Sequence, residues 1–497
     1  MITKFTPRHY FWFVMIAFLA GCGTPSQERP NSQTGGGTVN PVASPDLARL
    51  PPILMQTLTP LPIDFPTHIA ETLTAIPTHP PTPTSALQPP PCTFPLEQTI
   101  AKGLPQENYT FSEPKVVLTN VQAILHLIEW LPDNQQILLT RDNLNDQSRI
   151  NDQTLELFNP QTGTIQEYAT RKTTLDNPPT WVADLNAVVY PETTLLSSTI
   201  INGMRTSPYV IQRQLLFSRG DPAHAQMLED AQQTVDYVSA FSVVAKPDAS
   251  EIAYFNNIDK QLYRQKVSKG SLETLPPVPF DPIQWGAPLV SLQMSWRPGT
   301  SQVFVYNFSN SRSIPSHTFL LDTDTGQVCG VDMFVNNVEH DNSVVLARWS
   351  QDGRYLAVII WDAYQEPNSL VILDTTSGKL YEIRAEDLTP PETDGLRRIN
   401  DIAWSPDNRH LVALTQVLDL SLAQTVNQSY FKFSGLFLAD FLSGQSIPIS
   451  PSNQKLGSSF GKTNLLWSDD GLQLLVNCAA NGADRLCLIS VQKNVLP

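Results

Sequence analysis

The chain has 497 residues, of which 41% are hydrophobic and only 16% charged, with 32 Lys+Arg against 47 Asp+Glu and a net charge of −15. This length allows two or three ordinary domains or one large repeat architecture, and the apolar share is enough for a sizeable core. No window outside the N-terminus concentrates basic residues, which argues against a nucleic-acid-binding protein, because phosphate neutralisation needs a basic surface.

Residues 1–21 are predicted to be an export signal. Lys4 and Arg8 form a positive n-region, and residues 10–19 form an apolar run that is short for a membrane span. The following Leu-Ala-Gly-Cys22 resembles the lipobox of bacterial lipoproteins. The resemblance implies that Cys22 is lipidated and that the protein is exported and anchored to the cell membrane or the outer membrane. The alternatives are an ordinary signal peptide with a chance cysteine, or an uncleaved anchor.

Residues 22–91 are predicted to be a disordered linker rich in Pro, Thr and Ser. Prolines crowd residues 77–91, and proline removes backbone donors and favours extended polyproline II. Such a segment is a semi-rigid spacer that would hold a domain away from the membrane.

From residue 92 onward one pattern recurs: a strand ending in Trp, a tight turn rich in Pro, Asp, Asn and Gly, and an apolar strand. A second turn, as in Asp374-Thr-Thr-Ser-Gly378, brings the count to four strands per unit. Intervals of 51 to 64 residues separate the units, which start at Trp130, Trp181, Ala245, Trp296, Trp349, Trp404 and Trp467. Periods of this size indicate a propeller or a solenoid. The sequence therefore predicts an all-β fold, a seven-bladed β-propeller with four-stranded blades spanning residues 92–497.

The turn pattern, seen as Trp404-Ser-Pro-Asp-Asn408, resembles the WD-like Trp-Ser-Pro-Asp-Gly repeat of TolB-type β-propellers, which also occurs in prolyl-oligopeptidase-type enzymes. The resemblance covers about residues 112–497 and implies a propeller that contacts other proteins in the cell envelope. Two units depart from it, since Ala245 replaces Trp and Gly299 replaces Asp.

The last unit has about three strands and ends near Val491, whereas residues 115–119 form an extra strand ahead of the first unit. Pairing these two segments would complete the seventh blade and remove an exposed edge. We therefore expect the ring to close through residues 115–119.

Besides Cys22 there are four cysteines, an even number that permits two disulfides in an exported chain. Cys478 and Cys487 flank a predicted hairpin and can face each other across it, which leaves Cys92 and Cys329 as the remaining pair. No Cys-x-x-Cys pattern and no pair of His at metal-ligand spacing occurs, so we expect neither a metal nor another cofactor.

The long connections are predicted to lie on one face of the disc, where binding concentrates on a rigid scaffold. They are residues 141–154, 192–209, 219–236, 361–368 and 419–430. Residues 223–233 are predicted to be a short helix. Trp361, Asp362 and Tyr364 form the most recognition-like cluster, although the same residues could equally fill packing space.

No catalytic residue is predicted. Gly457-Ser-Ser-Phe-Gly461 has the spacing of a nucleophile elbow but no helix after it and no His beyond position 410. Asp322-x-Asp324-x-Gly326 lacks the later Glu of a calcium loop and is predicted to be a turn.

The sequence thus favours a monomeric, membrane-anchored scaffold that binds a protein, peptide or glycan in the envelope. The alternative is a propeller enzyme, a hydrolase or lyase acting on glycans, with carboxylates at the central channel. Acids clustered with Arg or Tyr at the channel would favour the enzyme, and a calcium-dependent sugar-binding protein is a third possibility.

Overall fold

A computed structural model of the chain describes residues 89–94, 108–120, 123–143, 151–173, 178–201, 204–221, 224–235, 242–256, 259–268, 270–281, 292–307, 318–331, 342–362, 369–389, 395–418, 431–450, 455–456, 463–479 and 484–494. The predicted export signal, Cys22 and nearly all of the predicted linker lie outside these ranges. In the described ranges, no helix has the length and apolar character that crossing a bilayer requires.

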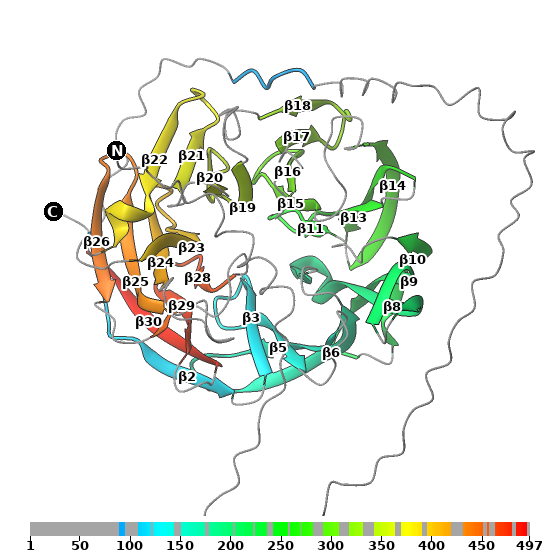
Figure 1. The fold of residues 1–497 in the computed structure, drawn as a ribbon, viewed down its shortest axis with the longest axis horizontal. Helices are drawn as coiled ribbons and strands as arrows, with labels where there is room; N and C mark the ends of the chain where they lie inside the picture. The colour runs from blue at the N-terminus through cyan, green and yellow to red at the C-terminus, as the bar shows by residue number, and fades with distance from the viewer. Residues whose placement is uncertain are drawn as a thin grey trace, which may run out of the picture. The chain divides into compact units, whose positions relative to one another are not determined.

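The described strands form seven antiparallel sheets, and each sheet is one blade of a β-propeller (Figure 1). Blade 1 is β3 (Ala123–Trp130), β4 (Ile137–Asn143), β5 (Asn151–Phe158) and β6 (Ile165–Thr173); blade 2 is β7 (Thr180–Val182), β8 (Ala187–Ile201), β9 (Met204–Ser218) and β10 (Gln226–Val235); blade 3 is β11 (Val243–Ala245), β12 (Glu251–Asn256), β13 (Gln261–Ser268) and β14 (Ser271–Pro279). The predicted all-β, seven-bladed fold is confirmed, and the two units that depart from the repeat also form blades.

The remaining blades follow the same order from the innermost strand outward. Blade 4 is β15 (Leu292–Trp296), β16 (Gln302–Asn307), β17 (Thr318–Asp322) and β18 (Val328–Gly330); blade 5 is β19 (Asn342–Trp349), β20 (Tyr355–Asp362), β21 (Ser369–Asp374) and β22 (Leu380–Arg384); blade 6 is β23 (Leu396–Trp404), β24 (His410–Leu418), β25 (Phe431–Asp440) and β26 (Gln445–Ser450). Among the described residues, the 3-10 helix η1 (Ala183–Leu185) lies in blade 2, and the 3-10 helix η6 (Ala385–Leu388) follows blade 5.

Blade 7 joins the two ends of the propeller. It contains β27 (Lys455–Leu456), β28 (Leu465–Trp467), β29 (Gln473–Ala479) and β30 (Asp484–Asn494), and β30 also pairs with β1 (Asn108–Phe111) and β2 (Lys115–Asn120). The innermost strands contact one another in succession around the ring, from β3 through β7, β11, β15, β19, β23 and β28 back to β3. The units of Trp130 and Trp467 are therefore neighbours, and the ring is closed.

Two of the repeat tryptophans, Trp349 and Trp404, pack between blades and also bond to the neighbouring blade. The Trp349 Nε1–H donates to the Ser295 carbonyl at 3.2 Å, and the Trp404 Nε1–H donates to the Arg348 carbonyl at 3.1 Å. In each case the acceptor lies on the innermost strand of the preceding blade. Each tryptophan thus combines a large buried surface with a polar bond across the blade boundary.

The second turn of four blades has one geometry. Its first residue accepts, through Oδ1, the N–H two positions on at 2.9–3.1 Å, and its glycine has a φ of 70–72°, in Asn159–Gly163, Asp322–Gly326, Asp374–Gly378 and Asp440–Gly444. The Asp322 segment is therefore a turn, as predicted. In blades 5 and 6 the acid also binds an arginine of the Trp turn, through Arg354–Asp374 at 2.8 Å and Arg409–Asp440 at 2.5 Å. These ion pairs join the two turns of one blade.

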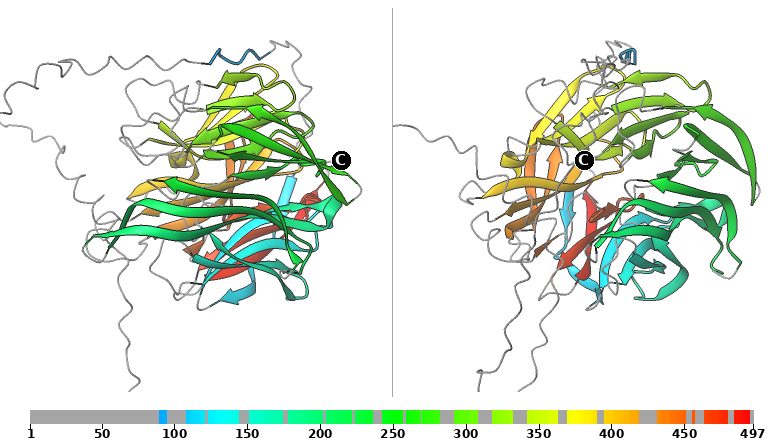
Figure 2. Two further views of the ribbon diagram at one scale, coloured as in Figure 1. Left: turned by 90° about the vertical axis from the view of Figure 1, so that its right-hand side faces the viewer. Right: turned by 45° about the vertical axis from the view of Figure 1, so that its right-hand side comes forward.

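Two of the predicted loops are mostly strand, and residues 141–143 and 151–154 of a third belong to β4 and β5. Residues 192–201 and 204–209 belong to the hairpin of β8 and β9, whose strands have 15 residues each and can be followed in green in Figure 2. The predicted helix at residues 223–233 is wrong, because residues 226–235 form β10, which pairs with β9. Pairing with a sheet edge overrides the helical propensity of its Ala, Met, Leu, Glu and Gln residues.

We predict that two alanine substitutions at left-handed glycines will separate backbone strain from blade packing. Gly163→Ala should destabilise the fold by about 1–2 kcal/mol, the penalty of a positive φ, because no atom lies within 4 Å of the added Cβ. Gly353→Ala should lose about 1–3 kcal/mol more from overpacking, because its Cβ would lie 2.5 Å from the Pro298 carbonyl oxygen of blade 4. Urea unfolding followed by tryptophan fluorescence measures both; equal losses would contradict the tight contact between blades 4 and 5.

Candidate functional site

The innermost strands pose a hydrogen-bonding problem that side chains must solve. Each of them pairs with a strand on one side only, so the N–H groups on the other edge need a different acceptor. Two carboxylates supply it, one at the boundary of blades 1 and 2 and one at the boundary of blades 6 and 7. These acids are the strongest candidates for chemistry near the axis.

Glu129, on β3, bonds to the innermost strand of the next blade. Its Oε1 accepts the backbone N–H of Trp181 at 2.5 Å, and the Thr180 side chain also donates to it. Solvent reaches part of the side chain, yet protein surrounds the carboxyl group closely enough for burial to raise its pKa to about 7. The Arg348 guanidinium, on β19, is near enough to lower that pKa in part.

Asp401, on β23, makes the equivalent bond from blade 6 to blade 7. Its Oδ2 accepts the N–H groups of Asn464 and Leu465, the latter at 2.9 Å, and its Oδ1 accepts its neighbour Ile402 N–H at 2.8 Å. The side chain has no solvent-exposed surface. Burial raises the pKa of Asp401 to about 6, and these bonds together with Arg348 limit the rise.

Arg348 connects blades 5, 6 and 7. Its Nη2 lies 3.7 Å from Asp401 Oδ1 and donates to Thr463 Oγ1 at 2.7 Å, while its carbonyl accepts the Trp404 indole N–H. With 29% of its side chain exposed, Arg348 is a cation that remains accessible from solvent. Tyr306 is buried nearby, and its hydroxyl bonds to the Ala347 backbone.

Acids, an arginine and a tyrosine therefore meet near the axis, which is the combination that would favour an enzyme. Their bonding differs from that of a poised catalytic pair. Asp401 is fully buried with backbone donors on both oxygens, so only Glu129 and Arg348 remain accessible. A glycosidase of the two-carboxylate type needs two acids flanking the substrate, whereas this arrangement offers one accessible acid–base group and one cation.

A second buried network crosses blade 1. His126 Nε2 lies 2.8 Å from Asp142 Oδ2, Gln153 bonds to both Asp142 and Arg171, and Arg171 Nη1 donates to the Pro191 carbonyl of blade 2 at 3.0 Å. Burial lowers the pKa of Arg171 to about 9. Each strand of the blade contributes one side chain, so the network ties the blade together and joins it to its neighbour.

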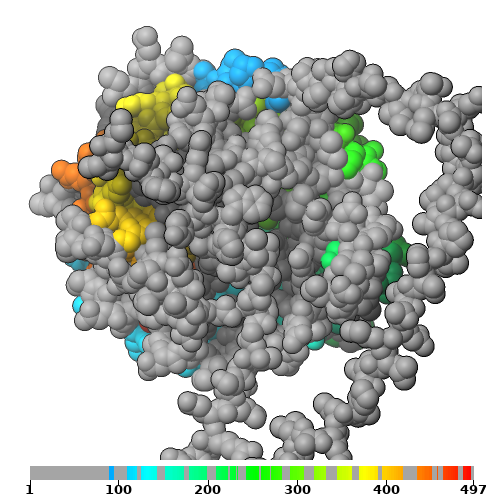
Figure 3. Space-filling view, in the orientation of Figure 1, coloured from blue at the N-terminus to red at the C-terminus, as the bar shows by residue number. Residues whose placement is uncertain are grey.

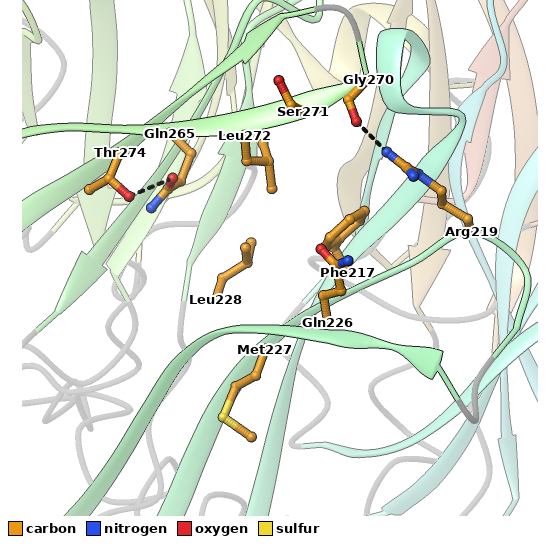
Figure 4. Close-up of a pocket in the computed structure, with 10 residues that line it drawn as sticks. All are labelled: Phe217, Arg219, Gln226, Met227, Leu228, Gln265, Gly270, Ser271, Leu272 and Thr274. Atoms are coloured by element: carbon orange, nitrogen blue, oxygen red, sulfur yellow. Dashed lines mark hydrogen bonds between the residues drawn. The ribbon is translucent and has the colours of Figure 1, made fainter.

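A pocket of about 480 Å³ lies between blades 2 and 3, at the outer ends of their sheets (Figure 4). Leu228 of β10 and Leu272 of β14 face it from opposite sides, and Gln265 and Thr274, bonded to each other at 3.1 Å, close one end. At the other end Arg219 donates to the Gly270 carbonyl, as the dashed line shows. Its size falls within the range of ligand pockets.

The charge of the residues that line this pocket differs from that of the chain as a whole. Its lining residues include one cation, two amides and two hydroxyls but no acid, although the protein carries a net charge of −15. Arg219 is exposed, and Gly270 O is its one hydrogen-bond acceptor among the described residues. Among the described residues, nothing accepts the other N–H groups of this guanidinium, which leaves them to a ligand.

The residues singled out from the sequence are placed only in part. Trp361 and Asp362 are the last residues of β20, opposite Ser343 and Asn342 of β19; they belong to a strand and not, as expected, to a loop. Their side chains, Tyr364, and the segments 419–430 and 457–461 fall outside the described part of the chain, so a binding role for this cluster stays a prediction. In the orientation of Figure 1, the space-filling view shows described residues mainly around the rim (Figure 3).

The structure contains two disulfides, Cys92–Cys329 and Cys478–Cys487, the two pairs that the sequence analysis considered. Within the described ranges, no three His, Cys, Asp or Glu side chains lie together as a metal site would require.

Sequence reasoning missed Glu129, Asp401, Arg348 and the pocket. The one signal for Glu129 and Arg348 was their position directly before a repeat Trp.

We predict that Glu129 makes the stability of the fold depend on pH. Because its pKa is about 7 in the folded protein and 4.5 as the usual value, the folded state binds the proton more tightly. The stabilisation of the folded state by protonated Glu129 is therefore fully present below pH 4.5 and is lost as the pH rises through 7. Glu129→Gln keeps an acceptor oxygen without a charge, so its stability relative to wild type should rise between pH 5 and 8.

Thermal unfolding across this pH range measures the effect. Glu167→Gln, at an exposed position of β6, is the matched control and should parallel wild type. If Glu129→Gln also runs parallel to wild type, burial does not perturb Glu129.

No family model matches the chain, and no curated protein matches it. Among solved structures, oligogalacturonate lyase from Vibrio parahaemolyticus is similar over 78% of this chain and 97% of that chain, with 12% identity and a TM-score of 0.45. The periplasmic gluconolactonase of Pseudomonas aeruginosa is similar over 65% and 84%, with 14% identity and a TM-score of 0.40. The β-propeller domain of Cps50 from Myceliophteria thermophila is similar over 73% and 99%, with 9% identity and a TM-score of 0.40. Similarity this weak says nothing about activity, so function must be inferred from the residues.

Proposed function

We propose that this protein is an exported, lipid-anchored β-propeller of TolB-like type that acts as a binding scaffold in the cell envelope. The observation that carries the proposal is a difference between the charged side chains near the axis and the arginine in the pocket between blades 2 and 3. Near the axis, Glu129 and Asp401 accept backbone N–H groups of the next blade, whereas the exposed Arg219 in the pocket between blades 2 and 3 has, among the described residues, one hydrogen-bond acceptor, the Gly270 carbonyl. Carboxylates that bond neighbouring blades together suit a rigid platform. An exposed guanidinium whose other N–H groups are bound by no described residue suits recognition of a ligand.

Two features support the location. The Leu-Ala-Gly-Cys22 sequence after an apolar run predicts lipidation. Disulfides persist mainly in oxidising compartments. Here Cys92 of the entry segment is paired with Cys329 of blade 4, and Cys478 is paired with Cys487 within blade 7. Export to the outer side of a membrane is consistent with both.

The pocket supports a ligand that carries a carboxylate beside an apolar or sugar-ring face. An arginine forms charge-assisted hydrogen bonds with a carboxylate. Leu228, Leu272 and Phe217 offer apolar contact, while Gln226, Gln265, Ser271 and Thr274 offer amides and hydroxyls. An acidic peptide or an acidic glycan of the envelope has these properties.

A glycan-cleaving enzyme is the second candidate, and one observation favours it. Glu129 is partly accessible, its pKa is about 7, and Arg348 lies near it. A carboxyl group that titrates near neutral pH is suited to take or give a proton. In this case Glu129 would act as the acid–base group and Arg348 would bind an acidic sugar.

We predict that Arg219→Ala will weaken binding of acidic ligands about 10- to 100-fold, the effect of losing one hydrogen bond to a charged group. The measurement is fluorescence polarisation with acidic peptides and uronic-acid oligosaccharides, each paired with an uncharged analogue. Lys379→Ala is the matched control, because it removes an exposed cation on blade 5 and should leave binding unchanged.

The same panel separates the two functions. The expected result is ligand binding that Arg219→Ala weakens, without any cleavage. The contrary result is cleavage of the oligosaccharides that is lost in Glu129→Gln and kept in Arg219→Ala. It would show that the protein is a glycan-cleaving enzyme and would overturn the scaffold proposal.

We further predict that Cys22→Ala will release the protein from membranes, because the thiol is the proposed site of lipid attachment. Fractionation of cells with carbonate and then detergent measures this, with Cys478→Ser/Cys487→Ser as the control that keeps Cys22. A variant that still requires detergent would argue against lipidation.

A further inference from the structure

The segment that enters the propeller is fastened to blade 4. Pro91 forms a parallel bridge with Gly330 at the end of β18. The Cys92 N–H donates to the Gly330 carbonyl at 3.0 Å, and the Gly330 N–H donates to the Pro90 carbonyl at 2.9 Å. These residues therefore extend the outer edge of blade 4.

A covalent bond and side-chain packing strengthen this attachment. The Cys92–Cys329 disulfide spans 237 residues of sequence. Cys92, Phe94 and Cys329 pack against the core between blades 4 and 5, and Phe94 lies over Gly378 of blade 5. The entry segment is thus held by a disulfide, a strand-like bridge and an aromatic contact.

The strands that close the ring lie elsewhere, on blade 7. Phe111 of β1 is opposite Val491 of β30, and Lys115 of β2 is opposite Leu488. Both strands fall between Cys92 and Cys329 in the sequence, so they are inside the loop that the disulfide closes. A pull on the chain before Cys92 reaches Cys329 through the disulfide and bypasses both closing strands.

We infer that the blade 4 attachment protects ring closure from tension on the N-terminal linker. Without it, tension would act on the end of β1 and break its hydrogen bonds with β30 one at a time, and each contributes only about 0.5–1.5 kcal/mol. With it, tension acts on β18, an outer strand whose loss leaves the ring closed. The biological source of tension rests on the proposed lipid anchor, whereas the mechanical claim does not.

Optical tweezers test this on the full, unlipidated chain. Four of the five cysteines are paired, so Cys22 is the remaining thiol for one DNA handle, and Ser377→Cys in the blade 5 turn takes the second. In this protein and in its Cys478→Ser/Cys487→Ser derivative, we expect no discrete lengthening step of the propeller at low force. Cys92→Ser/Cys329→Ser should add an early lengthening step on the order of 100 Å, the contour of about 28 residues between Cys92 and Asn120 that is freed when the blade 4 contacts and strands β1 and β2 are released.

A second measurement avoids variants that fold poorly. In the Cys478→Ser/Cys487→Ser derivative, adding a reductant after folding breaks only the Cys92–Cys329 bond, and the early step should then appear in the same molecule. An early step of this size before reduction, or none after it, would overturn the inference. Neither result depends on lipidation, so failure here is distinct from failure of the proposed anchor.

Discussion

The pairing of β30 with β1 and β2 is the contact on which the rest of the propeller depends. Each blade buries one face against its successor, so an open ring would leave two faces without a partner. At the seam, Leu475, Leu486 and Leu488 of blade 7 pack with Leu125 and Leu127 of blade 1. Closure turns a row of repeats, each stable only through its neighbours, into a ring without free end faces.

Polar groups near the axis follow from the same constraint. A propeller leaves one edge of every innermost strand without a strand partner, and this protein places Glu129 and Asp401 at two such edges. Both carboxylates are desolvated and raised in pKa as a result. A perturbed pKa often marks a catalytic group, but structural ion networks perturb pKa values as well, and the bonding partners decide between the two. Backbone donors surround Asp401, whereas Glu129 keeps partial access to solvent.

The repeats could be predicted from the sequence because their signals are local. The Trp turn and the Asp–Gly turn are set by residues within five positions of each other, such as Asp374 and Gly378. The features that were missed depend on pairing and contact with other strands, which no local sequence signal reports. Residues 226–235 are helix formers that become β10 only because β9 offers an edge. The pocket combines Arg219 of blade 2 with Gly270 of blade 3, a proximity that appears only once the blades are assembled.

Hydrogen exchange of the full chain at the closing strands tests the central claim most directly. The amides of β2 that are hydrogen-bonded to β30 should be protected to a degree similar to those of β29, because β2 pairs with β30 in a closed ring. Exchange of these amides at the rate of an unstructured peptide, while β29 stays protected, would show that β2 does not complete blade 7 and would contradict the account.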